Sequence, residues 1–266
     1  MNDTKMPVIF SGHGSPMVAL EDNEITRGMR LIGDTVIDRF GTPKAILAVS
    51  GHWYTRGTFV QKTDAPKQVY DMYGFPEALY QVKYPTKGCA ELSDRVLALL
   101  DGAASVNNEW GIDHGTWTVL VHMFPQADIP VVQLSIDSTA ARVAHYELGR
   151  KLAALRMEGC LIFASGNIVH NLRRVEWDNP NGTEMTLAFN DYVIDKLKSR
   201  EDEAVIQYER GPHAEYAVPT PDHFLPLLYA MGASAGEKPL VFNNICNLGS
   251  MAMTGFAFGL ELPSAE

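Results

Sequence analysis

Histidines follow three short apolar segments of the chain, and their positions suggest a shared chemical site. The segments are Val8–Ser11, Ala45–Ser50 and Cys160–Ser165, and the histidines that follow them are His13, His52 and His170. Short apolar runs that end in Ser-Gly predict buried strands, which occur mainly in parallel α/β sheets. Such sheets bind ligands outside the carboxyl ends of their strands. Convergent imidazoles at that edge predict a transition-metal site.

Other positions extend this set of histidines. Of eight histidines, five follow glycines or lie at helix starts or near strand ends: His13, His52, His114, His170 and His223. His122 and His145 fall within helical patterns, which favours structural roles. The chain lacks HExxH, a GxSxG nucleophile elbow and the glycine-rich phosphate loops. A serine triad built on Ser15 or Ser165 stays open as an alternative.

The composition narrows the possible partners and the cellular setting. The chain has 266 residues and a formal net charge of −10, which argues against nucleic acid or an anionic membrane as a partner. Its three cysteines show no CxxC spacing, which is typical of inert thiols in a reducing compartment. We find no signal peptide and no apolar stretch long enough to span a membrane. We therefore expect a cytoplasmic protein that is a monomer or a small homo-oligomer.

Hydrophobic periodicity and turn residues predict an α/β fold, and no linker divides residues 1–266 into separate domains. The predicted helices are Asp22–Phe40, Cys89–Leu100, Thr139–Glu158, Glu184–Arg200 and Thr220–Gly232, the last with Thr220 as its N-cap and His223 in its first turn. The other predicted strands are Lys44–Ser50, Pro130–Ser135, Leu240–Phe242 and Met251–Phe258, with Thr58–Gln61 and Gln68–Tyr70 as short candidates. We expect Trp110–Trp117 to be a loop before a helix that ends near Met123. The aromatic segment Tyr70–Pro85 is either a lid or pocket wall, or a packed surface excursion.

Seven motifs, spread over nearly the whole chain, resemble one enzyme family. They are GHGSP at Gly12–Pro16, SGHW at Ser50–Trp53, GFPEALY at Gly74–Tyr80, DHGTW at Asp113–Trp117, QLSID at Gln133–Asp137, ASGNIVHNLR at Ala164–Arg173, and PTPDHFLPLLYAMGA at Pro219–Ala233. The chain resembles the LigB-type extradiol ring-cleavage dioxygenases, and within them the DOPA 4,5-dioxygenase-like branch. The resemblance implies a single α/β domain, a mixed central sheet flanked by helices, and one metal ion at the carboxyl ends of the strands.

The resemblance also implies roles for the histidines. It makes His13, His52 and His223 metal ligands, with His170 as a fourth ligand or as the acid/base. His114 would support the site or contact the substrate. The implied metal is Fe(II) for turnover. An all-histidine donor set also suits Zn(II). Ring-cleaving iron sites commonly include a carboxylate, and no obvious one stands at the matching place: Asp222 is next to His223, and Glu261 is near the end of the chain.

The implied reaction is extradiol cleavage of a catechol, such as DOPA or a related phenolic acid, by O2 to give a semialdehyde. Imidazole suits the proton transfers because its pKa is close to neutral. Trp53, Tyr73, Phe75 and Trp117 are candidates for a wall that stacks on the catechol, or else ordinary core aromatics, and Arg173 is a candidate partner for a substrate carboxylate. Two alternatives stay open: a zinc hydrolase on the same scaffold, and a metal-binding protein without catalytic activity.

Overall fold

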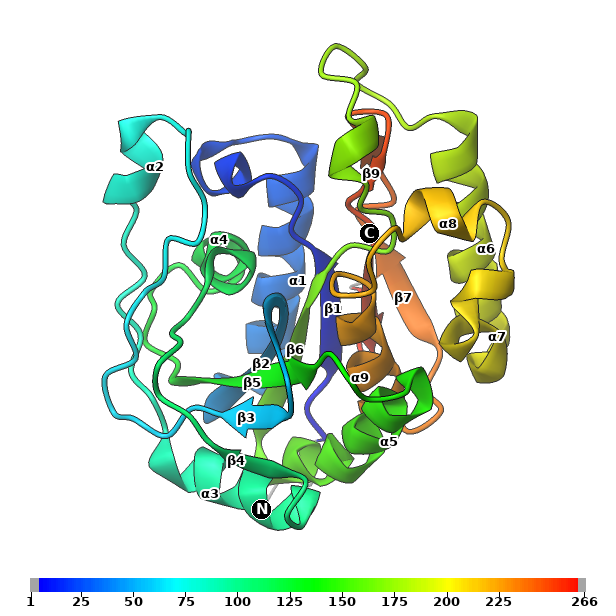
Figure 1. The fold of residues 1–266 in the computed structure, drawn as a ribbon. Coiled ribbons are helices and arrows are strands. Elements are labelled where there is room, and N and C mark those ends of the chain that lie inside the picture. Colours follow the sequence, from blue (N-terminus) through cyan, green and yellow to red (C-terminus); the bar gives the residue numbers. More distant parts are fainter. Residues whose placement is uncertain (1–4, 263–266) are drawn as a thin grey trace.

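A mixed eight-stranded sheet runs through the centre of the molecule (Figure 1). The computed structural model describes residues 5–262. The strands of this sheet are β1 (Val8–Gly12), β2 (Ala45–Thr55), β3 (Thr58–Val60), β4 (Ala104–Val106), β5 (Val131–Asp137), β6 (Cys160–Gly166), β7 (Pro239–Phe242) and β10 (Gly255–Phe258), and β8 (Cys246–Asn247) pairs with β9 (Met251–Ala252) in a small separate sheet. The order across the large sheet is β4-β3-β5-β2-β6-β1-β10-β7. Strands β5, β2, β6 and β1 are parallel, and β10 and β7 continue the sheet in antiparallel pairing. The predicted α/β fold with a mixed central sheet is confirmed.

Helices cover both faces of the sheet. They are α1 (Glu24–Phe40), α2 (Glu77–Gln81), α3 (Ala90–Leu100), α4 (His114–Met123), α5 (Arg142–Leu152), α6 (Glu184–Ser199), α7 (Asp202–Ile206), α8 (Ala214–Ala217) and α9 (Leu225–Ala233), with 3-10 turns η1 (Pro16–Leu20), η2 (Ala153–Glu158), η3 (Leu172–Arg174) and η4 (Tyr208–Arg210). Helices α1 and α4 pack on one face, and α5 and α9 on the other (Figure 1). Because strand side chains alternate between faces, Val8 and Phe10 join one core while Ile9 joins the other.

The parallel register brings the Ser-Gly dipeptides of the sequence to the same side of the sheet, where the carboxyl ends of β1 and β6 lie. Gly12 lies opposite Gly166, and Ser50 lies opposite Ser165. A glycine is needed at the end of β6, because a Cβ on Gly166 would lie 2.1 Å from the backbone oxygen of His223. The chain segment that carries His223 therefore crosses directly over the end of β6.

Helix α4 begins earlier than the sequence analysis expects. We predicted a loop over Trp110–Trp117, but the helix starts at His114 and only residues up to Asp113 are irregular. Asp113 is the N-cap, and its side chain accepts a hydrogen bond from the backbone N–H of Thr116 at 3.2 Å. The consequence is that His114 occupies the first position of a helix.

Two other predicted helices are shorter than expected. The prediction of Thr220–Gly232 with Thr220 as its N-cap is wrong: α9 begins at Leu225, and His223 precedes it. Pro226 has no N–H to donate to the carbonyl of Asp222, so a regular helix cannot extend back through His223. The segment Thr139–Glu158 is α5 followed by the 3-10 turn η2.

Several strand predictions also change. Strand β2 continues to Thr55 with an irregular register after Val49, so His52 lies within a strand rather than after it. Met251–Phe258 is divided between β9 and β10, which belong to different sheets. Gln68–Tyr70 makes only an isolated bridge from Gln68 to Ile112, and the edge strand β4 was not predicted.

Candidate metal centre

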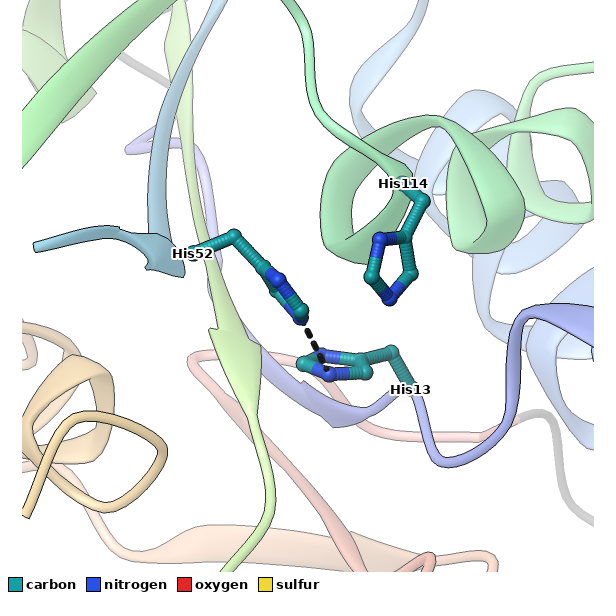
Figure 2. Close-up of side chains that lie close together, drawn as sticks. All are labelled: His13, His52 and His114. Carbon is teal, nitrogen blue, oxygen red and sulfur yellow. Dashed lines mark hydrogen bonds between the residues drawn. The ribbon is translucent and has the colours of Figure 1, made fainter. Parts of the chain in front are cut away.

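Five histidine rings meet at the carboxyl edge of the sheet, from elements far apart in the sequence. His13 follows β1, His52 lies on β2, His114 starts α4, and His170 and His223 lie in loops after β6 and before α9. Ring centroids of His13, His52 and His223 are 4.9 to 5.1 Å apart. Figure 2 shows His13, His52 and His114 directed toward one another. The expected convergence of imidazoles at this edge is therefore present in the structure.

His13 and His52 are spaced as two ligands of one metal ion would be. Their Nε2 atoms lie 3.1 Å apart (Figure 2). Two metal–nitrogen bonds of about 2.1 Å that meet at roughly 95–100° span this distance. The pair can therefore bind one ion without rearrangement of the strands that carry it.

The outward ring nitrogens are held by protein groups. His13 Nδ1 lies 2.9 Å from Ser165 Oγ, and His52 Nδ1 lies 2.9 Å from Asp71 Oδ2. His223 Nδ1 is hydrogen-bonded to the carboxylate of its neighbour Asp222. A partner that holds Nδ1 directs the Nε2 lone pair toward the centre, as in metal sites where a carboxylate orients a histidine ligand.

Two residues are candidates for the third ligand. The donor nitrogens of His13, His52 and His114 all lie within 4.8 Å of one another. The distances between ring centroids favour a different third ligand. A ring centroid lies about 3.2 Å from a bound ion, so two ligands with a nitrogen–metal–nitrogen angle of 90–110° have centroids roughly 4.6–5.3 Å apart. His223 meets this range to both His13 and His52, whereas His114 lies at 5.9 Å from His13 and 3.9 Å from His52. By ring spacing, His223 is therefore the better candidate for the third ligand.

His170 stacks face to face on His223. The two rings are 3.7 Å apart between centroids and only 4° from parallel. A nitrogen lone pair lies in the plane of its ring, so an ion bound in the plane of His223 lies far out of the plane of His170. The stacked arrangement therefore places the lone pairs of the two rings in separate, nearly parallel planes.

Burial and neighbouring charge set the protonation of these rings. Burial lowers the pKa of His13 and His223, and it lowers the pKa of His170 to about 2. Burial opposes the charged form of His52 as well, but the carboxylates of Asp71, Asp113 and Asp222 raise its pKa overall. Neutral imidazoles are the forms that bind metal ions, so most of the cluster is ready to coordinate.

A buried carboxylate supports the centre from behind. Asp113 is fully buried and accepts hydrogen bonds from Ser50 Oγ at 2.8 Å, from Trp110 Nε1 at 3.1 Å and from the side-chain amide of Gln133. This network connects β2 and β5 to the start of α4. We identified DHGTW as a motif but assigned no role to its aspartate.

The predicted substrate-contact residues are scattered. Trp117 is fully buried, and its indole N–H donates to the backbone oxygen of Val69 at 3.0 Å, so it packs in the core. Trp53 is buried as well. Tyr73 is 92% exposed, Phe75 is half-buried, and Arg173 is exposed in η3. The four candidate wall residues therefore differ widely in exposure, from the fully buried Trp117 to the open Tyr73.

Asp71 is the site residue that the sequence analysis missed. It belongs to the aromatic segment Tyr70–Pro85, three residues before the motif GFPEALY. Nothing in its local pattern separates it from an ordinary surface carboxylate. Only the fold shows that this segment returns to the edge of the sheet and places Asp71 against His52.

The family comparison agrees with the fold and this cluster. The family described as the catalytic LigB subunit of aromatic ring-opening dioxygenase matches residues 7–259. The chain belongs to this family, and it is an extradiol, ring-cleaving dioxygenase that binds a metal.

Relatives of this chain include extradiol dioxygenases named for DOPA. The chain is 43% identical to the 4,5-DOPA dioxygenase extradiol of Escherichia coli K12 over 266 aligned residues, which cover 97% of each chain. It is 37% identical to the protein of the same name from Beta vulgaris over 264 aligned residues, which cover 96% of this chain and 97% of the relative. A crystal structure of an uncharacterized E. coli K12 protein matches with a TM-score of 0.83 and 41% identity, over 96% of this chain and all of that chain. The predicted family is thereby confirmed.

Proposed function

We propose that this dioxygenase cleaves the ring of a catechol beside its two hydroxyl groups, with O2 as co-substrate, to give a semialdehyde. The observation that carries the proposal is the 3.1 Å separation of His13 Nε2 and His52 Nε2 within a cluster of five imidazoles. The names of the E. coli and Beta vulgaris relatives support a DOPA-like catechol as the substrate class.

We assign the metal site to His13, His52 and His223. Imidazole donors whose Nδ1 atoms are held by Ser165, Asp71 and Asp222 fit a divalent transition metal. Such an ion, Fe(II) for turnover or Zn(II) as an occupant of the same site, would bind the two catechol oxygens and bring oxygen and the ring together. A neutral three-histidine set is the donor set of known zinc sites, whereas iron dioxygenase sites commonly include a carboxylate.

His170 is assigned the acid/base role. Burial lowers its pKa, so the ring is neutral and unprotonated. The assignment rests on the position of the ring beside the proposed ligands. Its stacked position beside His223 places it next to the proposed ligands without competing for the ion. His114, whose ring centroid lies 3.9 Å from that of His52, is assigned a substrate-contacting role.

Tyr73 and Phe75 are proposed to contact the substrate, because they lie in the same short segment as Asp71, which touches His52. Trp53 follows His52 on β2 and keeps its proposed role as a wall residue. Arg173 lies three residues after His170 in an exposed turn, where it is a candidate partner for a substrate carboxylate. The fully buried Trp117 is better explained as core packing. The free thiols of Cys89, Cys160 and Cys246 support a reducing, cytoplasmic location.

The deciding experiment measures oxygen uptake. The metal-free protein is loaded anaerobically with Fe(II) or with Zn(II), mixed with a panel of catechols that includes DOPA and phenolic acids, and then exposed to air. We expect the iron form to consume one O2 per catechol and to produce the absorbance of a semialdehyde. Catechol binding without oxygen consumption would contradict the proposal. Turnover of esters by the zinc form, independent of oxygen, would instead favour a hydrolase.

A further inference from the structure

Asp71 joins two histidines of the cluster to the aromatic segment. Its Oδ2 lies 2.9 Å from His52 Nδ1, and its Oδ1 accepts the backbone N–H of His114 at 2.9 Å. The same Oδ1 lies 2.9 Å from His114 Nδ1, although the ring is not oriented for a regular hydrogen bond there. The carboxylate is mostly buried, with 13% of its side chain exposed. One side chain thus contacts two imidazoles that come from different elements.

The segment that carries Asp71 is otherwise weakly attached. Its base is fixed, because Val69 N–H donates to Ile112 O at 2.8 Å and Tyr70 Oη donates to Val82 O at 2.7 Å. Between these points, residues 71–75 make hydrogen bonds or ion pairs to the rest of residues 5–262 only through Asp71. The tip is open to solvent, with Tyr73 92% exposed. Apolar contacts of Met72 and Phe75 with the core supply the remaining attachment.

We propose that Asp71 is a positioning residue that makes metal binding and the ordering of residues 71–75 a single event. This inference deepens the metal site on which the proposed function rests. When the carboxylate holds His52 in the tautomer with its Nε2 lone pair facing His13, it also fixes the tip of the segment. By thermodynamic linkage, an ion that favours this orientation of His52 must stabilise the ordered tip by the same factor.

The chemistry of an Asp71→Asn substitution makes the proposal testable. An asparagine offers one acceptor oxygen, and the backbone N–H of His114 can only donate, so it retains that oxygen. The amide NH2 then faces His52 Nδ1 and favours the tautomer with its proton on Nε2. That proton occupies the position of the lone pair that would bind the ion.

The test uses Zn(II) without catechol or turnover. Zinc affinity is measured by competition with a chromophoric chelator, and chymotrypsin cleavage after Tyr73 is followed by mass spectrometry with and without zinc. In the wild type we expect zinc to slow this cleavage. In Asp71→Asn we expect zinc affinity to fall about 10–100-fold, the usual effect of losing an orienting partner, and zinc to give little protection even at saturation.

Two further variants complete the design. Asp64→Asn removes an exposed carboxylate of the preceding stretch whose side chain has no partner within residues 5–262, and it should match the wild type in both measurements. Asp71→Glu keeps two acceptor oxygens on a longer arm and should recover part of the affinity. Circular dichroism establishes that each variant is folded.

Different results would contradict the role of Asp71 and the proposed function. Wild-type zinc affinity in Asp71→Asn, or unchanged zinc protection of Tyr73 in that variant, would overturn the proposal. Equal losses in Asp71→Asn and Asp71→Glu would overturn the two-oxygen explanation. If the zinc coupling is present but the iron-loaded enzyme consumes no oxygen with any catechol, only the proposed function fails.

Discussion

The histidines of this chain differ in role because their partners differ. The Nδ1 atom of His13 is held by a hydroxyl, and those of His52 and His223 are held by carboxylates, while the Nε2 atoms of His13 and His52 face each other. His122, in contrast, uses Nε2 to contact the backbone oxygen of Val18 at 2.8 Å, so that nitrogen is already occupied. The nitrogen that the protein leaves unused, rather than burial alone, separates a candidate ligand from a structural histidine.

The first prediction compares His223→Ala with His114→Ala. Removing a ligand should reduce zinc affinity by more than the roughly 100-fold that loss of an outer partner costs. We expect this loss in His223→Ala, because its ring has ligand spacing to both His13 and His52. We expect His114→Ala to bind zinc within about ten-fold of the wild type. Isothermal titration with zinc measures both variants, and the reverse ranking would make His114 the third ligand.

The second prediction concerns His145, which lies in α5 and is fully buried against Tyr229. Burial lowers its pKa to about 4, below the ~6.5 of an unfolded histidine. Between these values the unfolded chain binds a proton that the folded chain does not bind. Stability should therefore fall as the pH drops from 6.5 toward 4, by up to about 3 kcal/mol from this group.

Urea unfolding of the metal-free protein at several pH values tests this prediction against His145→Gln. The amide keeps a hydrogen-bonding group near Tyr229 but does not titrate. As the pH falls, the unfolding free energy of the wild type should decrease more than that of the variant. A difference that stays constant over this range would show that His145 does not contribute to acid destabilisation.

At the scale of elements, close backbone approaches define the shape of the centre. A Cβ on Gly115, in the first turn of α4, would lie 2.7 Å from His52 Cδ2 and 2.9 Å from Ser50 Oγ. The start of α4 thus packs directly on the metal-facing part of β2. A second close approach lies near the carboxyl end of α9, where a Cβ on Gly232 would lie 2.0 Å from the backbone oxygen of Tyr146 on α5.

The third prediction follows from this pair of glycines. Gly115→Ala favours helix formation locally, by up to about 1 kcal/mol, but displaces His52, so it should lower zinc affinity about ten-fold or more. Gly232→Ala should lower the thermal midpoint, because two backbones must separate, and leave zinc affinity per folded molecule unchanged. Thermal unfolding and zinc titration of both variants measure the two effects. Equal zinc affinities in Gly115→Ala and the wild type would contradict the close contact with His52.

At the scale of the whole molecule, a buried arginine connects distant parts of the fold. The side chain of Arg156, in η2, is fully buried. Its Nε donates to Met6 O at 2.6 Å, its Nη1 donates to Ala233 O at 3.1 Å, and its Nη2 contacts Glu237 at 2.6 Å. The guanidinium therefore joins the segment before β1, the end of α9 and the approach to β7.

The fourth prediction is that Arg156→Met destabilises the protein by about 3 kcal/mol, because it leaves the buried carbonyls and Glu237 without their donor. Arg150→Met is the matched control: Arg150 is 60% exposed and, within residues 5–262, pairs only with Glu147, so its loss should cost less than about 1 kcal/mol. Chemical denaturation measures both variants. Similar effects of the two substitutions would show that the buried network adds little to stability.

No helix within residues 5–262 has the length and apolarity needed to cross a membrane. The molecule is a single α/β domain, and its two cores lie on opposite faces of one sheet. The candidate centre lies at one edge of that sheet. His13, His52 and His170 reach it because β1, β2 and β6 are parallel neighbours, and His114 and His223 reach it from the start of α4 and the loop before α9.

Much of this arrangement was predictable from local sequence. Buried strands β1, β5 and β6 are apolar runs bounded by turn residues, and the helical spacing of apolar residues identified α1, α3 and α6. The Ser-Gly steps correctly indicated where His13 and His170 leave the sheet. These signals are readable because periodicity and turn chemistry act over a few neighbouring residues.

Tertiary structure decided the rest, because the deciding contacts join residues distant in sequence. Asp71 meets His52 and His114 only after a long segment folds back, and His170 stacks on His223 only when the loop after β6 meets the loop before α9. The position of Trp117 in the core rather than in a wall likewise depends on how α4 packs. Residue types predicted which chemistry was present, and packing determined which nitrogen of each ring faces the centre.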